Sequence, residues 1–581
     1  MIATDQQQPG HPTGEHKQPT ALEGALREVR HGLAVVAALS LFLNLLVLVS
    51  PLYMFQVFDR VLPSGHVETL VALTVAAGFA LLVFGLLEVI RHQVLLRIST
   101  WLDRRLSGPV LAASVREALA ERPAGAQPLR DLAQLRAFIS SESVFPILDA
   151  PWTVVFIAVI WLLHPWLGVL ALLGAVLLFA LALGSEILMR APLGEANERW
   201  MAAHQRGEAA LRNAEVVHAM GMLPALLRRW HADNDRALDW HAQAGDRGAV
   251  TVGVAKFLRL FVQIAILGLG AYLVLEGELT GGGMIAGSIL LSRALAPVEQ
   301  AIGAWKGLVA ARASHDRLQS LLSRHPPSAP ALRLPEPEGR VSVERLVFAP
   351  PNGDRAILKG ITFELAAGEV LAVIGPSGSG KSTLCRLITG TWAPSSGHVR
   401  LDGAEVHTWE RGDFGAHVGY LPQSVELFAG TVRDNIARMT DAPDEAVIEA
   451  ARLAGCHELI LRLPGGYGTD VGPRGAGLSG GQRQWVGLAR AMFGNPRLVV
   501  LDEPNASMDG AGEAALIEGI GRLKARGTTV ILVAHRPSLL VHVDKLLVMH
   551  DGAGVLFGGR DEVLPRLMVK RAAPAVAAAA S

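Results

Sequence analysis

The sequence predicts an all-α membrane domain with six transmembrane helices, followed by an α/β domain. Hydrophobic residues make up 50% of the 581 residues and charged residues 18%, whereas soluble domains carry about 25% charged residues. The long apolar runs lie before residue 300, and from Val341 onward short apolar strands alternate with helices, as in domains with a mostly parallel sheet. Basic and acidic residues number 53 each, which argues against nucleic-acid binding driven by net charge.

Five uncharged runs account for the six predicted spans, because one run is long enough for two. A span needs about 20 apolar residues to cross the hydrocarbon layer. The run at 150–185 has 36 residues and is interrupted by His164 and Pro165, which predicts a tight turn between antiparallel helices. The last two runs are short and must extend past Arg259 and Arg293. The runs are 32–57, 70–87, 150–185, 260–275 and 279–292.

Arginines set the predicted orientation in the membrane. Segments 91–143 and 189–248 each carry eight arginines and no lysine, whereas the short connections 58–66 and 276–278 hold one basic residue between them, Arg60. Cytoplasmic loops are enriched in basic residues. We therefore expect the N-terminus and both long segments in the cytoplasm. The patterning of these segments is helical, so they are expected to reach well outside the membrane.

A phosphate-binding loop follows the strand predicted at 369–374. Its glycines let backbone N–H groups and the N-terminus of the next helix converge on phosphates. Lys381 is expected to reach the β- and γ-phosphates, and Ser382 to bind Mg²⁺. The loop reads Gly375-Pro376-Ser377-Gly378-Ser379-Gly380-Lys381-Ser382, with Thr383 next, and matches G-x-x-x-x-G-K-[ST] between a strand and a helix.

Two further predicted strands end in ionisable residues. The strand at 497–501 leads into Asp502 and Glu503, and the strand at 528–534 leads into His535. A phosphoryl hydrolase needs one carboxylate for the Mg²⁺ shell and another group to orient the attacking water, so we assign these tasks to Asp502 and Glu503. His535 lies at the edge where parallel sheets bind ligands.

A fourth motif makes a family resemblance specific. Leu478-Ser479-Gly480-Gly481-Gln482 ends 20 residues before Asp502 and leads into a predicted helix at 484–492. These motifs, in this order, resemble the ATPase domain of ABC transporters. The six spans with two long cytoplasmic segments resemble an ABC exporter half-transporter, so the expected architecture is the ABC type I exporter fold followed by a P-loop ATPase domain.

The resemblance implies a role for each motif. Gln423 is expected to contact Mg²⁺ and the attacking water, His535 to hold the γ-phosphate, and Asp509 to close the loop after the Asp-Glu pair. The family's two sites form between head-to-tail domains, which implies a homodimer. The expected catalytic residues are Glu503, His535, Gln423 and Lys381. The expected Mg²⁺ ligands are Ser382, Gln423 and Asp502. The residues expected to contact ATP held by the second copy are Ser479, Gly480, Gly481 and Gln482.

Three further segments are similar to type I secretion ATPases of the protease- and lipase-exporter kind. They are residues 51–64, the Asp149-Ala150-Pro151-Trp152 entry to the third span, and residues 290–297. The similarity implies ATP-driven export of an unfolded protein with a C-terminal signal across the bacterial inner membrane. It also implies a periplasmic membrane-fusion adaptor and an outer-membrane duct as partners. About 31 residues precede the first span, so neither a cleaved signal peptide nor an N-terminal peptidase-like domain is expected.

Some residues depart from the family pattern. Pro350 stands where a tyrosine usually stacks on adenine, so the base is expected to rest on Phe348 or on weaker contacts. Pro473, Trp485 and Met508 replace a common glutamate, arginine and leucine. The two cysteines, Cys385 and Cys456, exclude a disulfide scaffold.

Alternatives share parts of this pattern. An exporter of lipids or small molecules would have the same architecture. Six spans disfavour an ATPase acting on nucleic acid, and the complete catalytic set disfavours a silent subunit. Charged residues in or next to the last two spans either face solvent or line a path, and we hypothesise that Arg293 lines the export path.

The expected domain boundaries follow from these patterns. The predicted domains are a cytoplasmic tail at 1–31, a transmembrane domain at 32–312, a proline-rich linker at 313–340, an ATPase domain at 341–570 and a flexible tail at 571–581.

Overall fold

The computed structural model describes residues 20–119, 125–326, 334–350, 353, 355–506, 508–534 and 536–566. The chain divides after Pro327 into two compact units, a membrane unit and an ATPase unit. The predicted tail at 571–581, the prolines at 327–330 of the predicted linker and the side chain of His535 lie outside the described residues.

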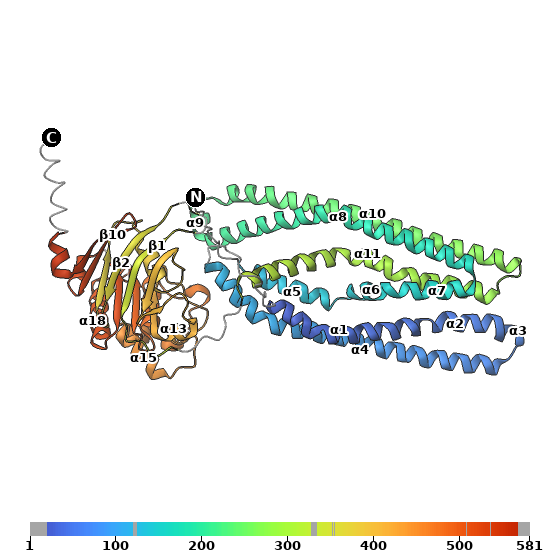
Figure 1. Cartoon of the computed structure of the whole chain (residues 1–581), viewed down its shortest axis with the longest axis horizontal. Coiled ribbons are helices and arrows are strands. Elements are labelled where there is room, and N and C mark those ends of the chain that lie inside the picture. The colour runs from blue at the N-terminus through green and yellow to red at the C-terminus, as the bar shows by residue number, and fades with distance from the viewer. Residues whose placement is uncertain are drawn as a thin grey trace, which may run out of the picture. The chain divides into compact units, whose positions relative to one another are not determined.

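Within its described residues, the membrane unit has six helical segments that are long and apolar enough to cross a membrane, which confirms the predicted number. Figure 1 shows these helices running alongside one another. The segments are Ala21–Ser64, Val67–Leu119, Val144–Leu163, Pro165–Arg212, Leu223–Leu275 and Gly281–Arg324. The first comprises α1 (Ala21–Val47), α2 (Val49–Gln56), the π-helical turn η1 (Val57–Val61) and α3 (Leu62–Ser64). The others comprise α4 (Val67–Leu119), then α6 (Val144–Asp149), η2 (Ala150–Trp152) and α7 (Thr153–Leu163), then α8 (Pro165–Arg212), α10 (Leu223–Leu275) and α11 (Gly281–Arg324).

The predicted hairpin turn separates α7 from α8. His164 has an extended backbone, with φ −162° and ψ 135°, and its side chain accepts a hydrogen bond from the backbone N–H of Trp166. Pro165 is the first residue of α8, a position where its missing N–H costs nothing. One short segment therefore ends one span and starts the next.

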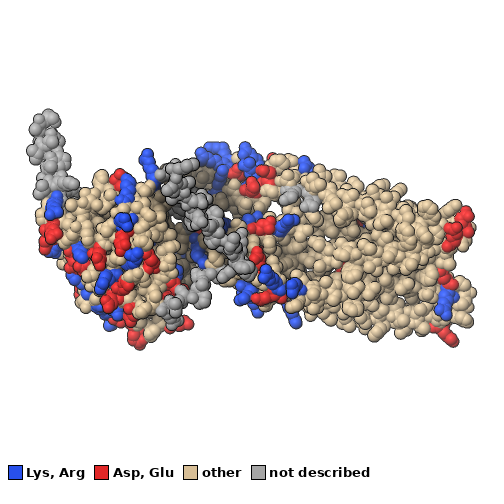
Figure 2. Space-filling model, viewed as in Figure 1, with Lys and Arg blue, Asp and Glu red and all other residues tan. Residues whose placement is uncertain are grey.

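The two arginine-rich segments are helical, as their patterning indicated. Helix α4 continues to Leu119 and is followed by α5 (Gln127–Ile139), while α8 continues to Arg212 and is followed by the short α9 (Ala214–Ala219). Leu106, Val110 and Leu132 of these extensions pack with Leu318 of α11 in one apolar cluster. Figure 2 shows an uncharged surface along the middle of the helices and charged side chains gathered towards their ends.

Two expected boundaries differ from the structure. Helix α1 begins at Ala21, where Thr20 and Glu23 form a capping box, so residues 21–31 belong to a helix rather than to a tail. Helix α11 continues to Arg324, so residues 313–324 belong to this helix rather than to a linker. The reason is a buried stripe of Ser314, Leu318 and Leu321, which neighbouring charged residues concealed in the sequence.

Buried ion pairs join neighbouring helices of the membrane unit. Arg91 of α4 contacts Asp149 of α6 at 3.0 Å, and its side chain is 6% exposed. Asp131 of α5 accepts two hydrogen bonds from Arg317 of α11, at 2.6 and 2.9 Å. Arg259 of α10 and Glu299 of α11 form another pair. The two residues of each pair are 40 or more positions apart in the sequence.

The described part of the ATPase unit forms two sheets. The six-stranded sheet has the order β10-β9-β3-β8-β7-β6, and its strands are parallel except for the antiparallel β10. The four-stranded sheet, β2-β1-β4-β5, is antiparallel. The strands of the first are β3 (Val370–Ile374), β6 (Val418–Leu421), β7 (Leu498–Asp502), β8 (Thr529–Val533), β9 (Lys545–His550) and β10 (Ala553–Gly559). Those of the second are β1 (Val341–Phe348), β2 (Leu358–Leu365), β4 (Ser396–Leu401) and β5 (Ala404–Glu405).

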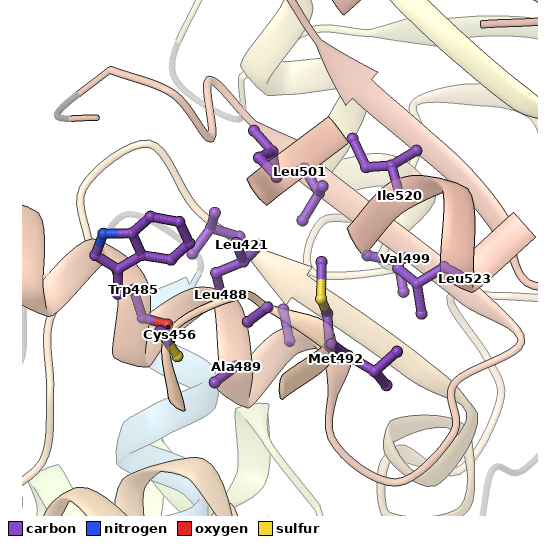
Figure 3. Packing of buried hydrophobic residues seen from close by; sticks show 14 of the residues in the cluster. Leu421, Cys456, Trp485, Leu488, Ala489, Met492, Val499, Leu501, Ile520 and Leu523 are labelled. Atoms are coloured by element: carbon purple, nitrogen blue, oxygen red, sulfur yellow. Dashed lines mark hydrogen bonds between the residues drawn. The ribbon is translucent and has the colours of Figure 1, made fainter. Parts of the chain in front are cut away.

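The two faces of the large sheet carry different helices. Alternate residues of β7 fall into different apolar clusters, with Val499 and Leu501 in one and Leu498 and Val500 in the other. Helix α17 (Gly480–Met492) packs in the first cluster, where Figure 3 shows Trp485 and Met492 among the buried side chains. Helix α12 (Lys381–Ile388) packs in the second. The remaining helices of eight or more residues are α15 (Asp444–Leu453) and α18 (Gly510–Ala525).

Candidate nucleotide site

The phosphate-binding loop connects β3 to α12, as the sequence predicted. Gly378 and Gly380 have φ values of 80° and 95°, in the left-handed region that favours glycine. A Cβ atom on Gly380 would lie 2.6 Å from a methyl carbon of Leu358, so a side chain here would also displace a buried leucine. The loop is exposed at Pro376, Ser377 and Gly378, which leaves its N–H groups accessible to a phosphate.

Lys381 lies buried at the start of α12, beneath this loop. Its ammonium group donates to the backbone oxygens of Gly375 and Pro376 at 3.0 and 2.9 Å. Burial lowers the pKa of Lys381, and the nearby Glu503 and Asp502 partly oppose this change. A nucleotide phosphate would replace weak carbonyl acceptors with a full negative charge, which gives a stronger, charge-assisted hydrogen bond.

Asp502 ends β7 beside the phosphate loop and is 2% exposed. Burial raises its pKa, and a hydrogen bond from Ser382 opposes that rise. Its Oδ1 atom is buried and has no hydrogen-bond partner among the described residues. Such an oxygen costs free energy until a ligand satisfies it. Asp502 and Ser382 therefore lie next to each other, and their shared role in binding Mg²⁺ stays a prediction.

Glu503 and Gln423 also meet in the structure. The amide nitrogen of Gln423 donates to Oε2 of Glu503 at 3.1 Å, across 80 residues of sequence. Glu503 has a φ of 54°, which is unusual for a residue with a side chain and marks a backbone held by its surroundings. The next strand, β8, ends at Val533, two residues before His535.

The Leu-Ser-Gly-Gly-Gln motif forms the N-terminus of α17. Ser479 is the N-cap, its Oγ accepts from the backbone N–H of Gln482, and the side chain of Gln482 accepts from the N–H of Ser479. Ser479 and Gly480 are exposed. The N-terminus of a 13-residue helix carries free N–H groups and a positive dipole, both suited to an anion.

Comparisons with known proteins agree with these motifs. Residues 33–297 match the family described as "ABC transporter transmembrane region", and residues 358–506 match "ABC transporter". A Rhizobium meliloti protein, "Type I secretion system ATP-binding protein PrsD", is 44% identical over 96% of this chain and 95% of its own length. The chain belongs to the ABC transporter family. It therefore has a nucleotide-binding ATPase domain and a multi-pass membrane domain.

Two more comparisons place this ABC transporter among its relatives. The "Cyclolysin secretion/processing ATP-binding protein CyaB" of Bordetella pertussis is 32% identical over 93% of this chain and 77% of its own length. A solved structure described as "a bacterial Atm1-family ABC exporter with ATP bound" superposes with a TM-score of 0.81, 24% identity and coverage of 93% of this chain and 96% of the other. The latter shows that the exporter fold is shared.

Phe348, one of the contacts expected for the adenine base, is already packed against another ring. This ring is 6% exposed and stacks on Trp392, with ring centroids 5.0 Å apart and planes 11° from parallel. The guanidinium of Arg386 lies 4.5 Å from the centre of the Trp392 ring. Phe348 therefore belongs to the core beside this ABC transporter's phosphate loop and is not free to stack on adenine.

Sequence reasoning missed two supporting residues. Glu513 of α18 accepts a hydrogen bond from Arg536 at 2.7 Å and another from Ser538, and so anchors the segment after β8. Gln484 of α17 is 4% exposed and donates to the backbone oxygen of Pro504 at 3.0 Å. This hydrogen bond connects α17 to the segment that follows Asp502 and Glu503. Neither contact has a sequence signal, because the partners are brought together only by the fold.

Proposed function

We propose that this chain is the inner-membrane ATPase of a type I secretion system and couples ATP hydrolysis to the export of an unfolded protein with a C-terminal signal. The observation that carries the proposal is the likeness to PrsD, which spans nearly all of both chains. The secretion protein CyaB, similar over both domains, supports it further. The expected partners are a periplasmic membrane-fusion adaptor and an outer-membrane duct.

The proposed active form is a homodimer with the ATPase domains and N-termini in the cytoplasm. Helices α12 and α17 pack on opposite faces of the same sheet, so the exposed Ser479 and Gly480 point to a role at a second copy's nucleotide. One chain supplies six spans and one ATPase domain, and two composite sites would need two of each. The enrichment of arginine in segments 91–143 and 189–248 supports this orientation, because cytoplasmic loops are rich in basic residues.

Mg²⁺ fits the residues present, because Asp502 has a buried oxygen without a partner and Ser382 contacts the same carboxylate. Asp502, Ser382 and Gln423 would hold the ion, and oxygen ligands of this kind suit Mg²⁺. When bound, Mg²⁺ would neutralise charge on the phosphate oxygens.

The protein groups then divide the remaining tasks of hydrolysis. The loop N–H groups and Lys381 hold the phosphates in place, and Glu503 accepts a proton from the attacking water. Gln423 keeps the Glu503 carboxylate oriented through its 3.1 Å hydrogen bond. His535 is proposed to hold the γ-phosphate. Ser479 and Gly481 of the second copy would close the site, so that hydrolysis releases the two domains.

Complementation tests the proposal directly. The chain would be expressed in Rhizobium meliloti lacking PrsD, together with its own adaptor where the host adaptor does not pair with it. We expect proteins lost from the culture medium to reappear, and the Glu503→Gln variant to fail as the matched control. In proteoliposomes, an ATPase rate that responds to lipids or small molecules but not to unfolded polypeptides would contradict protein export.

A further inference from the structure

A cavity of about 700 Å³ lies in the membrane unit, between α5, α8, α10 and α11. This volume is within the range of ordinary ligand sites. The lining residues Asn197 and Trp200 lie beyond the uncharged run that ends at Ser185, so the cavity is outside the apolar part of the spans. None of the motifs that bind nucleotide contributes to it.

Two basic side chains, Lys306 and Arg317, line the cavity. Lys306 donates to Nε2 of His241 at 2.8 Å, and Arg317 is already paired with Asp131. None of the described lining residues is acidic, and no ion pair involving Lys306 is found in the described part of the chain. Lys306 therefore offers a positive charge that no acidic side chain among the described lining residues neutralises.

Apolar side chains form much of the remaining cavity lining. Trp200, Leu238 and Val309 line the cavity. A second cavity of about 190 Å³, lined by Met189, Val252 and Ile302, shares Leu193 and Lys306 with the first. Lys306 thus lines both cavities, whose other lining residues are largely apolar. A ligand that fits both carries a carboxylate next to apolar groups.

Two amide side chains in the cavity lining favour a peptide over a lipid as the ligand. Asn197 and Asn234 line the cavity and make no hydrogen bond with any residue that the structure describes. An amide offers both donors and an acceptor, which match the N–H and C=O groups of a peptide backbone. An acyl chain has no such groups. The position outside the apolar runs also suits a polypeptide in water rather than a membrane lipid.

We infer that this cavity binds the C-terminal carboxylate and the last apolar residues of an exported polypeptide, with Lys306 as the residue that recognises the carboxylate. The inference rests on the proposed function, because it assigns a place to the cargo's C-terminal end. The amides of Asn197 and Asn234 contact the preceding peptide groups, and Trp200 packs against an apolar side chain.

The test uses the full-length protein in lipid nanodiscs and two fluorescein-labelled peptides of sequence Gly-Ser-Gly-Ser-Val-Leu-Val-Leu. One peptide has a free C-terminal carboxylate and the other a C-terminal amide. We expect the amide to bind about tenfold more weakly or worse by fluorescence anisotropy, because a hydrogen bond between charged groups is lost. Lys306→Gln should remove this difference and Lys306→Arg should keep most of it.

The matched control is Arg312→Gln, which changes an exposed arginine of α11 outside the cavity and should leave the preference for the carboxylate intact. Gel filtration and melting curves show whether each variant folds. Equal binding of both peptides to the parent protein, or an unchanged preference in a folded Lys306→Gln variant, overturns the inference. So does labelled oleate that binds in a Lys306-dependent way when neither peptide binds.

The outcome is separable from that of the complementation experiment. A Lys306-dependent preference for the carboxylate supports the inference even where export is not restored. Restored export together with equal binding of the two peptides overturns the inference alone and leaves the proposed function in place.

Discussion

Ion pairs between helices of the membrane unit and the charged groups of the nucleotide site differ in the contacts that satisfy them. In the membrane unit, Asp149 contacts Arg91 at 3.0 Å and Asp131 contacts Arg317 at 2.6 Å. In the ATPase unit, Asp502 keeps a buried oxygen without a partner among the described residues, and Lys381 donates only to backbone oxygens. The first arrangement holds helices together, whereas the second leaves charge available for a ligand.

This difference has an energetic consequence. A buried charge without a partner costs several kcal/mol, so pairing limits the cost of burying these charges between the helices of the membrane unit. In the empty nucleotide site, Asp502 and Lys381 destabilise the protein in this way. Binding of phosphate and a cation would give both groups a partner of opposite charge. The comparison predicts that mutations in the ion pairs of the membrane unit mainly lower stability. Mutations in the nucleotide site should mainly lower activity.

The largest expected effect is on catalysis in the ATPase unit. Glu503→Gln removes the carboxylate that accepts a proton from water but keeps the shape of the side chain. The ATPase rate should fall by about 10²- to 10⁴-fold, the usual contribution of a general base, while ATP stays bound. Release of phosphate and retention of radiolabelled ATP measure the two quantities.

The control for this change is Glu518→Gln in α18, an exposed glutamate paired with Arg522. It should hydrolyse ATP at the parent rate. A Glu503→Gln protein that turns over as fast as the control would show that another group accepts the proton.

The next effect is on the stability of the membrane unit. Asp149→Leu leaves the Arg91 side chain, which is 6% exposed, with Glu88 as its remaining acidic contact. Loss of one partner of a buried pair destabilises by roughly 3–5 kcal/mol, and the Glu88 contact places the expected value at the lower end. Unfolding in mixed detergent micelles measures the change.

The double variant Arg91→Met with Asp149→Leu should recover much of this loss, because the buried Arg91 charge is removed together with its partner. Glu88 loses its contact with Arg91, but its side chain is 39% exposed. Glu518→Ala, which breaks an exposed pair within one helix, should cost only about 0.3–0.5 kcal/mol. Equal losses for the buried and the exposed pair would contradict the comparison between the units.

A smaller effect concerns the empty nucleotide site and its dependence on pH. Burial raises the pKa of Asp502 above its ordinary value of 3.8, so the folded protein retains this proton at pH values where the unfolded chain has lost it. Folding therefore becomes less favourable as the pH rises above 3.8, and the cost persists at neutral pH.

Asp502→Asn removes this cost and should raise the melting temperature of the nucleotide-free protein at pH 7 by about 2–4 °C. The gain should shrink as the pH falls towards 4, and Mg²⁺-dependent hydrolysis should be lost. Melting curves from pH 4.5 to 8 measure the effect. A variant that melts below the parent at pH 7 would show that the carboxylate stabilises the empty site.

The sequence predicted best those features that depend on short stretches of backbone. Gly378 and Gly380 are needed for a loop with positive φ, and His164 with Pro165 forms a turn whose chemistry is local. The motif order then identified the site. These features are local because each is decided by a few adjacent residues.

Features decided by tertiary packing were predicted less well. The end of α11 looked like a linker because charged residues interrupt its buried stripe. Phe348 looked free for adenine because its partner, Trp392, lies in another part of the chain. The anchoring role of Glu513 depends on Arg536 and Ser538, which follow the next strand.

The smallest expected effect concerns the base end of the nucleotide site, which, unlike the phosphate end, has its aromatic ring already occupied. Pro350 is half-buried and lies two residues after the end of β1, where the family resemblance places a ring that stacks on adenine. Pro350→Tyr should tighten ATP binding by about three- to tenfold, because an aromatic stack contributes about 0.5–1.5 kcal/mol. The gain should lower KM and leave kcat unchanged, since the base binds equally in the ground and transition states.

Titration calorimetry with ATP measures the affinity. The control is Leu461→Tyr, at an exposed apolar residue elsewhere in the unit, which should leave the affinity unchanged. Equal affinities for the parent and Pro350→Tyr would mean that the base is already held as firmly by other contacts.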